Sequence, residues 1–368
     1  MTVNITPRIN LVRIAHVFYT YKDLNKAHEF LLDFGFQEVK RAGKDIYYRG
    51  TSSQPFVYCA RHGEEDVFGG AAFVVESEAD LVAAQELPGA TEIYELSDAP
   101  GGGRCVTFHD PIDDFPFHLV YGQTHWADEK ALPQLDFNFP TVKHRPGNKA
   151  QRLEKGPAPV HKIGHFGMCV TDFAKAFDFY TTRFNFKPSD IVQDSTGKDI
   201  TTFLHLDRGS ELVDHHCFFF FEGPKPHVHH SSFETHDFDT QVLGHDWLRS
   251  KGYENCWGVG RHIMGSQIFD YWFDPSRFII EHYVDGDLVN DEYPINRSLA
   301  SPGNLHARIF PHLPAVTWDM CFLFGIYRSD ERGNTNVQFA TFATQAGQGT
   351  GFWPTLVRVS LSISKKLL

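Results

Sequence analysis

Two stretches of the chain share one pattern of hydrophobic and polar positions, 149 residues apart. The first reads RIAHVFYTYKDLNKAHEFLLDFGF and the second reads KIGHFGMCVTDFAKAFDFYTTRFNF. In each, a short apolar strand carries a histidine, an aspartate follows seven residues later, and apolar residues then recur at helical spacing. His16 therefore aligns with His165, and the pattern predicts a strand followed by a helix in both places.

A second pair of similar segments begins at Gly69 and His229. GGAAFVVESEADLVAAQ parallels HHSSFETHDFDTQVLG, and each runs on through a turn to alternating strands that end in FPFHLVYG and FIIEHYVDG. Each repeated unit thus reads as a strand, a helix and three further strands. The sequence predicts an α+β fold in which four βαβββ modules, between residues 11 and 286, pair into two cup-shaped domains.

These repeats give the expected domain boundaries. We expect an N-terminal domain over residues 11–125, a linker over 126–160 that is rich in proline and polar residues, and a C-terminal domain over 161–286. Residues 287–368 are expected to form an extension. Its first part, up to about residue 316, is interpreted as a lid or arm over the mouth of the cup, and the remainder matches no module.

Three residues occupy equivalent strand positions in the C-terminal module pair: His165, His230 and Glu281. Side chains alternate along a strand, so we expect Glu281 to face away from His282 and His230 to face away from His229. Two imidazoles and one carboxylate form the facial triad that is typical of non-haem Fe(II) and leaves coordination positions free. The sequence therefore predicts a metal site that the three residues share.

The matching positions of the N-terminal pair are His16, Gly70 and His118. This set lacks the middle ligand and the carboxylate, so we interpret His16 and His118 as structural remnants. A single histidine on a strand is more often simply hydrogen-bonded than metal-bound. The interpretation of the C-terminal site therefore depends on its three residues together.

Beyond this triad, the span from about 11 to 286 resembles the type I extradiol dioxygenases of the vicinal oxygen chelate superfamily. The resemblance is carried by GHFGMCVTDFAKAFDFYTTRFNF, DHHCFFFFEGPKPHVHHSSFE and GRHIMGSQIFDYWFDPSRFIIEHY. It implies an Fe(II)-dependent enzyme of aromatic catabolism that inserts both atoms of dioxygen into a catechol-type ring, next to its two hydroxyls. Mn(II) could replace Fe(II), because imidazole and carboxylate ligands suit both ions.

Carried over residue by residue, the resemblance makes the triad the iron ligands and assigns three further roles. His216 is the histidine beside the dioxygen site, where it can donate a proton, and His262 and Tyr271 contact the substrate hydroxyls. The choice between His215 and His216 stays open. We prefer His216, because its alignment relative to His230 needs only a one-residue deletion.

Two positions depart from the signature that the resemblance supplies. It prefers an apolar residue where this chain has Asp270, and Gly or Pro where this chain has Arg277. Neither is a ligand, so they bear on substrate preference more than on the chemistry. The four consecutive phenylalanines 218–221 are expected in the core of a strand, and their even-numbered pair is expected to form an apolar wall near the substrate ring.

Composition narrows the choice of partners. The formal net charge of −12 disfavours nucleic acid, and no apolar run reaches the roughly eighteen residues of a membrane span. The six scattered cysteines have no CxxC spacing and are typical of reduced thiols in a cytosolic protein. We expect a cytoplasmic homo-oligomer whose partners are a catechol and dioxygen.

Two alternatives stay open on the same scaffold. A glyoxalase-like isomerase uses zinc or nickel, usually with four protein ligands, and would turn over without dioxygen. A non-catalytic module that binds a small molecule would lack the metal, which metal analysis of the purified protein would show.

Overall fold

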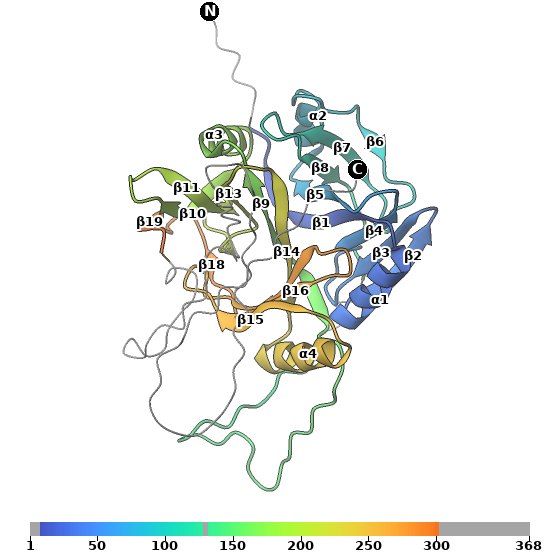
Figure 1. Ribbon diagram of the computed structural model, residues 1–368, viewed down its shortest axis with the longest axis vertical. Helices are drawn as coiled ribbons and strands as arrows, with labels where there is room; N and C mark the ends of the chain where they lie inside the picture. The colour runs from blue at the N-terminus through green and yellow to red at the C-terminus, as the bar shows by residue number, and fades with distance from the viewer. Residues whose placement is uncertain (1–7, 128–131, 302–368) are drawn as a thin grey trace, which may run out of the picture. The chain divides into compact units, whose positions relative to one another are not determined.

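The structure is a computed structural model that describes residues 8–127 and 132–301. Two large mixed β-sheets dominate the described residues (Figure 1). The strands of the first sheet are β1 (Leu11–Tyr21), β2 (Gln37–Ala42), β3 (Asp45–Arg49), β4 (Tyr58–His62), β5 (Val67–Val75), β6 (Tyr94–Glu95), β7 (Arg104–His109) and β8 (Pro116–Tyr121). They lie in the order β2-β3-β4-β1-β5-β8-β7-β6.

The second sheet has nine strands. They are β9 (Val160–Val170), β10 (Phe186–Gln193), β11 (Asp199–Leu206), β13 (Phe218–Glu222), β14 (His227–Thr235), β15 (Asn255–Arg261), β16 (Ile268–Phe273), β17 (Ile279–Val284) and β19 (Asn296–Leu299). Their order is β15-β16-β17-β14-β9-β13-β11-β10-β19. A separate two-stranded sheet joins β12 (Val213–Asp214) to β18 (Leu288–Val289).

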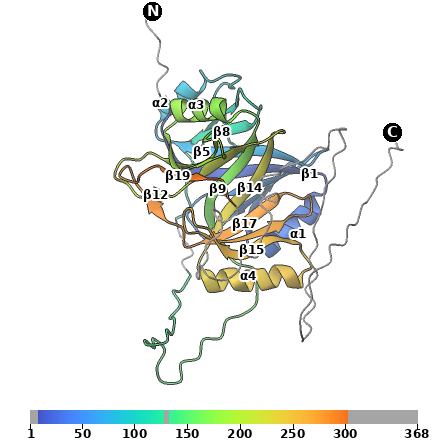
Figure 2. The ribbon, with the colours of Figure 1, turned by 60° about the vertical axis from the view of Figure 1, so that its left-hand side comes forward.

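Apart from β19, which has no counterpart in the first sheet, the strand orders of the two large sheets match position by position. When the second sheet is read in reverse, β9 takes the place of β1, β14 that of β5, and β17 that of β8. The first and last strands of each module are parallel neighbours, and the first strands of paired modules are antiparallel neighbours. Figure 2 shows the central pair of the second sheet, β9 and β14, side by side. The prediction of an α+β fold built from four repeated βαβββ modules is confirmed.

The segments between and after the sheets differ in structure. The described residues between β8 and β9 contain no helix or named strand, only an isolated bridge between Asn138 and Lys143. Beyond residue 286, β19 adds to the second sheet by pairing in parallel with β10, so part of the expected extension belongs to this sheet. The remainder of the expected lid, from residue 302, and the tail after it lie outside the described residues.

The helices begin where the sequence places an aspartate or serine. The aspartate seven residues after the first-strand histidine is Asp23 in one module and Asp172 in another, and each side chain accepts a hydrogen bond from a backbone N–H of the first helical turn. Each is therefore an N-cap. The helices are α1 (Leu24–Phe34), α2 (Glu78–Ala84), α3 (Phe173–Arg183) and α4 (Phe238–Ser250).

Polar contacts join the two halves of the described chain around one shared hydrophobic core. Asp33, near the end of α1, accepts hydrogen bonds from the indole of Trp247 (3.0 Å) and the hydroxyl of Tyr253 (3.1 Å). His282 of β17 donates to the backbone carbonyl of Phe34 (2.7 Å) and stacks on its ring. The first module therefore contacts the strand that carries Glu281 on the face opposite to that side chain. Within the described ranges, no helix is both long enough and apolar enough to cross a membrane.

Candidate active site

The three predicted ligands meet on neighbouring strands of the second sheet. Nε2 of His165, on β9, lies 3.1 Å from Nε2 of His230, on β14, and 3.1 Å from Oε2 of Glu281, on β17. Nε2 of His230 lies 3.2 Å from the same oxygen. All three side chains are buried. The structure therefore brings together residues that lie up to 116 positions apart in the sequence.

The donor set fits a divalent metal ion. Two ligand atoms that bind one ion at right angles, with bonds of about 2.1 Å, lie about 3.0 Å apart, close to the three separations measured here. Neither oxygen of Glu281 has a well-aligned hydrogen-bond donor among the described residues, and a buried carboxylate without compensation is costly. A cation at the centre of the three atoms would compensate this charge, and imidazole and carboxylate ligands suit iron or manganese.

The local electrostatics keep the ligands in the forms that bind metals. Burial alone would raise the pKa of the Glu281 carboxyl, but the imidazoles of His165 and His230 hold it well below its usual value. Burial lowers the pKa of His230 to about 4. The carboxylate is therefore anionic and the imidazole neutral at neutral pH, as metal ligation requires.

The equivalent positions of the first sheet confirm the predicted register. Ala72 pairs with His16 on one side and His118 on the other, as Ser232 pairs with two of the three ligands in the second sheet. Gly70 takes the place of the middle ligand, and Nε2 of His118 donates to a backbone carbonyl (2.9 Å). Within the described residues, no group of three potential ligands forms in this sheet.

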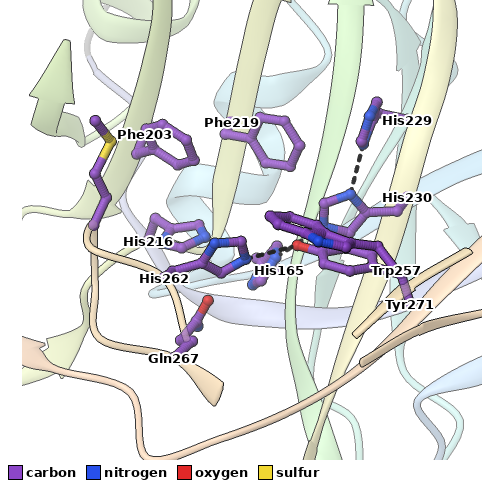
Figure 3. Close-up of a pocket in the computed structure, with 11 residues that line it drawn as sticks. His165, Phe203, His216, Phe219, His229, His230, Trp257, His262, Gln267 and Tyr271 are labelled. Carbon is purple, nitrogen blue, oxygen red and sulfur yellow. Dashed lines mark hydrogen bonds between the residues drawn. The ribbon is translucent and has the colours of Figure 1, made fainter. Parts of the chain in front are cut away.

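His229 departs from the expected alternation. A bulge interrupts the pairing of β14 with β9 between Val228 and His230. His229 therefore lines the same cavity as His230 instead of the opposite face, and their Nδ1 atoms are 2.7 Å apart (Figure 3). The prediction was wrong because a bulge inserts an extra residue and shifts the period of two. His229 contacts the ring nitrogen of His230 that points away from the ligand cluster.

The two histidines of the 215–216 pair have different surroundings. The ring of His216 lines the cavity, 4.3 Å from that of His165 between centroids. Burial lowers the pKa of His216 well below its usual value. His215 instead lies behind it, with Nε2 2.9 Å from a carboxylate oxygen of Asp190 on β10. Of the two histidines, His216 is therefore the one that lines the cavity.

His262 and Tyr271 form a hydrogen-bonded pair at the edge of the ligand cluster. Nε2 of His262 lies 2.9 Å from the Tyr271 hydroxyl (Figure 3). The same nitrogen lies 3.8 Å from Oε1 of Glu281. Burial raises the pKa of Tyr271 well above its usual value, so the phenol keeps its proton. The indole of Trp257 stacks on the Tyr271 ring, with centroids 5.6 Å apart and planes at 14°.

A cavity adjoins this cluster, and most of its other walls are aromatic. It is lined by His165, Phe203, His216, Phe219, His229, His230, Trp257, His262, Met264, Gln267 and Tyr271. Motif spacing gave no reason to single out Phe203, Trp257, Met264 or Gln267. These four come from different strands or from a turn, so only the fold brings them together.

We expected the even-numbered phenylalanines of the run 218–221 to face the cavity, but an odd-numbered one does. Phe219 lines the cavity, whereas the even-numbered Phe218 and Phe220 lie in the main core. In β13, Phe219 pairs with Gly167 of β9, and a Cβ on that glycine would lie 1.8 Å from the Phe219 ring. The missing side chain at Gly167 therefore makes room for the ring. The sequence indicated that the phenylalanine side chains alternate between the two faces of the strand, but it did not indicate which face lines the cavity.

The two departures from the signature also have structural explanations. Arg277 has φ of +71°, a left-handed conformation that glycine adopts at lower cost, which explains a preference for glycine at this position. Asp270 is fully buried, and its carboxylate accepts hydrogen bonds from His245 (2.9 Å), Trp272 (2.7 Å) and Asn255 (3.0 Å). The polar residue is accommodated because this chain supplies three donors around it.

The repeated modules and the buried His–His–carboxylate cluster define the class of protein: an α+β protein of paired βαβββ modules with a candidate metal site. Residues 162–282 match the family model described as Glyoxalase/Bleomycin resistance protein/Dioxygenase superfamily. The chain is 31% identical to a biphenyl-2,3-diol 1,2-dioxygenase of Pseudomonas sp. (strain KKS102) over 284 residues, which cover 74% of this chain and 88% of that protein. The chain belongs to the extradiol dioxygenases of this superfamily.

Other relatives agree with this placement. Metapyrocatechase 2 of Cupriavidus necator is 27% identical over 128 residues, which cover 35% of this chain but only 38% of that protein. Among solved structures, homoprotocatechuate 2,3-dioxygenase of Brevibacterium fuscum, in complex with 3,4-dihydroxyphenylacetate, superposes with a TM-score of 0.66 at 19% identity, covering 83% of this chain and 92% of that chain. A Mn(II)-bound glyoxalase from Novosphingobium aromaticivorans gives 0.67 at 21% identity, with coverages of 81% and 90%. At these identities the likeness of the structures concerns the fold alone.

Proposed function

We propose that this protein is a metal-dependent extradiol dioxygenase, which inserts both atoms of dioxygen into a catechol-type ring beside its two hydroxyls. The observation that carries the proposal is the cluster of His165, His230 and Glu281, with ligand atoms 3.1–3.2 Å apart at the wall of a cavity. We propose Fe(II) as the ion, with Mn(II) as the substitute that the same ligands suit. The bound ion supplies Lewis acidity that lowers the pKa of a catechol hydroxyl.

The residues around the cluster then have separate tasks. The hydrogen-bonded pair of Tyr271 and His262 orients a catechol hydroxyl, and Tyr271 can donate because it keeps its proton. His216 is a neutral base whose Nδ1 lies 3.1 Å from Nδ1 of His215, which leaves its Nε2 to accept and return a proton in the cavity. The aromatic walls exclude water from the reacting ring.

The cavity favours a neutral catechol. Among the described residues that line it, none is lysine or arginine, so a carboxylate on the substrate would meet no fixed positive side chain. Phe203, Phe219 and Trp257 instead offer large apolar surfaces to an aromatic substituent. This agrees with the relatives that act on biphenyl-2,3-diol, as their names state.

The test is reconstitution of the apoprotein with Fe(II) without oxygen, followed by a panel of neutral catechols and then air. We expect oxygen uptake together with a yellow ring-opened product. Glu281→Ala should lose the metal, whereas His216→Phe should keep the metal and the substrate but lose most of the turnover. His16→Gln, at the equivalent site of the first sheet, is the matched control and should leave the metal content unchanged. Absence of oxygen uptake with every catechol, or full metal content in Glu281→Ala, would contradict the proposal.

A further inference from the structure

Gln267 is a buried polar residue of the cavity wall that the proposed chemistry does not use. Its side chain is almost fully buried, at 2% exposure, and lines the cavity together with aromatic residues, histidines and Met264. Its Oε1 atom has no hydrogen-bond partner among the described residues. Figure 3 shows the amide oxygen directed toward the rings of His262 and His216.

The backbone around Gln267 fixes its position. The carbonyl oxygen of Gln267 accepts a hydrogen bond from the backbone N–H of His262 (2.8 Å), which closes the turn between β15 and β16. This turn presents His262, Met264 and Gln267 to the same cavity. A buried amide oxygen without a partner costs free energy, so a ligand that supplies a hydrogen bond here binds more favourably than one that does not.

We propose that Gln267 determines specificity by binding a neutral hydroxyl substituent of the catechol ring. The inference rests on the proposed function and narrows its substrate class. The two catechol hydroxyls are taken up by the ligand cluster and the His262–Tyr271 pair, which leaves the amide for a substituent. A hydroxyl can both donate and accept a hydrogen bond. It can therefore pair with the Gln267 amide whether the amide oxygen or the amide NH2 group faces the cavity. A methyl group of nearly the same size satisfies neither.

The experiment compares catechols that differ only in this substituent. The pairs are pyrogallol against 3-methylcatechol, and benzene-1,2,4-triol against 4-methylcatechol, with kcat/KM measured by oxygen uptake under Fe(II) and corrected for uncatalysed oxidation. Each hydroxyl-to-methyl ratio is compared between the wild type and Gln267→Met, so that the intrinsic reactivity of each ring cancels. For at least one pair we expect the ratio to fall about tenfold in the variant, as for the loss of one hydrogen bond.

Two controls keep the result interpretable. Ile263→Leu changes an exposed apolar residue of the same turn that does not line the cavity, and it should keep both ratios within about twofold of the wild type. Gln267→Met should unfold at the same or a higher temperature than the wild type without substrate, because it removes an unpartnered polar group. Unchanged ratios in Gln267→Met, or a marked loss of its stability, would overturn the role of Gln267 while leaving the dioxygenase proposal intact. Absence of oxygen uptake by the wild type with all four catechols and with unsubstituted catechol would overturn both.

Discussion

Replacing Asp270 by leucine tests whether its buried carboxylate holds together the strands behind the site. Leucine restores the apolar residue that the signature prefers, and changes toward a family consensus commonly stabilise proteins. Here we expect the opposite. The carboxylate accepts hydrogen bonds from Trp272 on its own strand, from His245 on α4 and from Asn255 on β15. Asn255 also donates to the backbone carbonyl of Tyr271 (2.9 Å).

The size of the effect follows from the burial of the three donors. Trp272 is fully buried, so its N–H would have no partner, at a cost of about 1–3 kcal/mol. His245 and Asn255 are only partly buried and can turn to water, at a cost of about 0.5–1.5 kcal/mol each. The buried leucine side chain returns roughly 1.5–3 kcal/mol. The midpoints of these ranges leave a net loss of about 2 kcal/mol, which corresponds to a fall in Tm of roughly 3 °C, because a unit of this size unfolds with an entropy change of about 0.6 kcal/mol/K.

The assay is thermal unfolding of the wild type, Asp270→Leu, Trp272→Phe and the double variant Asp270→Leu/Trp272→Phe. Trp272→Phe removes the donor but also leaves a gap in the core, so we expect it to cost less stability in the Asp270→Leu background than in the wild type. Asp270→Leu should also lower kcat/KM, because Asn255 would no longer be held against the Tyr271 backbone. A Tm that stays the same or rises in Asp270→Leu would refute the reasoning.

Three further predictions concern other positions. Gly167→Ala should push the Phe219 ring into the cavity and raise KM several-fold with little change in metal content, and an unchanged KM would contradict this. Burial raises the pKa of Asp274 from an ordinary value of 3.8 to about 6, so the folded state binds an extra proton between these values and loses stability as the pH rises through 6. Asp274→Asn should therefore gain up to about 3 kcal/mol relative to the wild type between pH 4 and pH 7 in urea unfolding, and a pH-independent difference would count against it. Arg277→Gly should relieve the left-handed backbone and raise the stability to unfolding by about 0.5–1 kcal/mol, whereas a lower Tm would show that the side-chain contacts of Arg277 dominate.

Most of the fold could be predicted from the sequence, because the four modules repeat one pattern of strand and helix periods. The same repetition aligned His16 with His165 and predicted which strands carry the ligands. A period of two also placed Glu281 and His282 on opposite faces, as their contacts with His165 and Phe34 bear out. Local patterns were sufficient here because each strand is regular at these positions.

The predictions from the sequence were wrong or missing where a residue's position depends on contacts between different strands, helices and turns. The bulge that turns His229 toward the cavity depends on how β14 pairs with β9. The orientation of Phe219 toward the cavity depends on the space beside Gly167. Gln267 lies in a turn with no periodicity, and the partners of Asp270 come from three separate elements. β19 was not expected at all, because four residues carry too little pattern to distinguish a strand from a loop.

Through the contact between His282 and Phe34, the N-terminal half of the described chain, which lacks a complete ligand set, supports a strand of the candidate site. The imidazole of His282, the residue next to Glu281, donates a hydrogen bond to the last residue of α1, which lies about 250 residues earlier in the chain. A fragment that begins at β9 would carry His165, His230 and Glu281. The strand that bears Glu281 would, however, lose its hydrogen bond to Phe34. Separated halves are therefore expected to need each other for tight metal binding at the proposed site, although only one of them carries the proposed ligands.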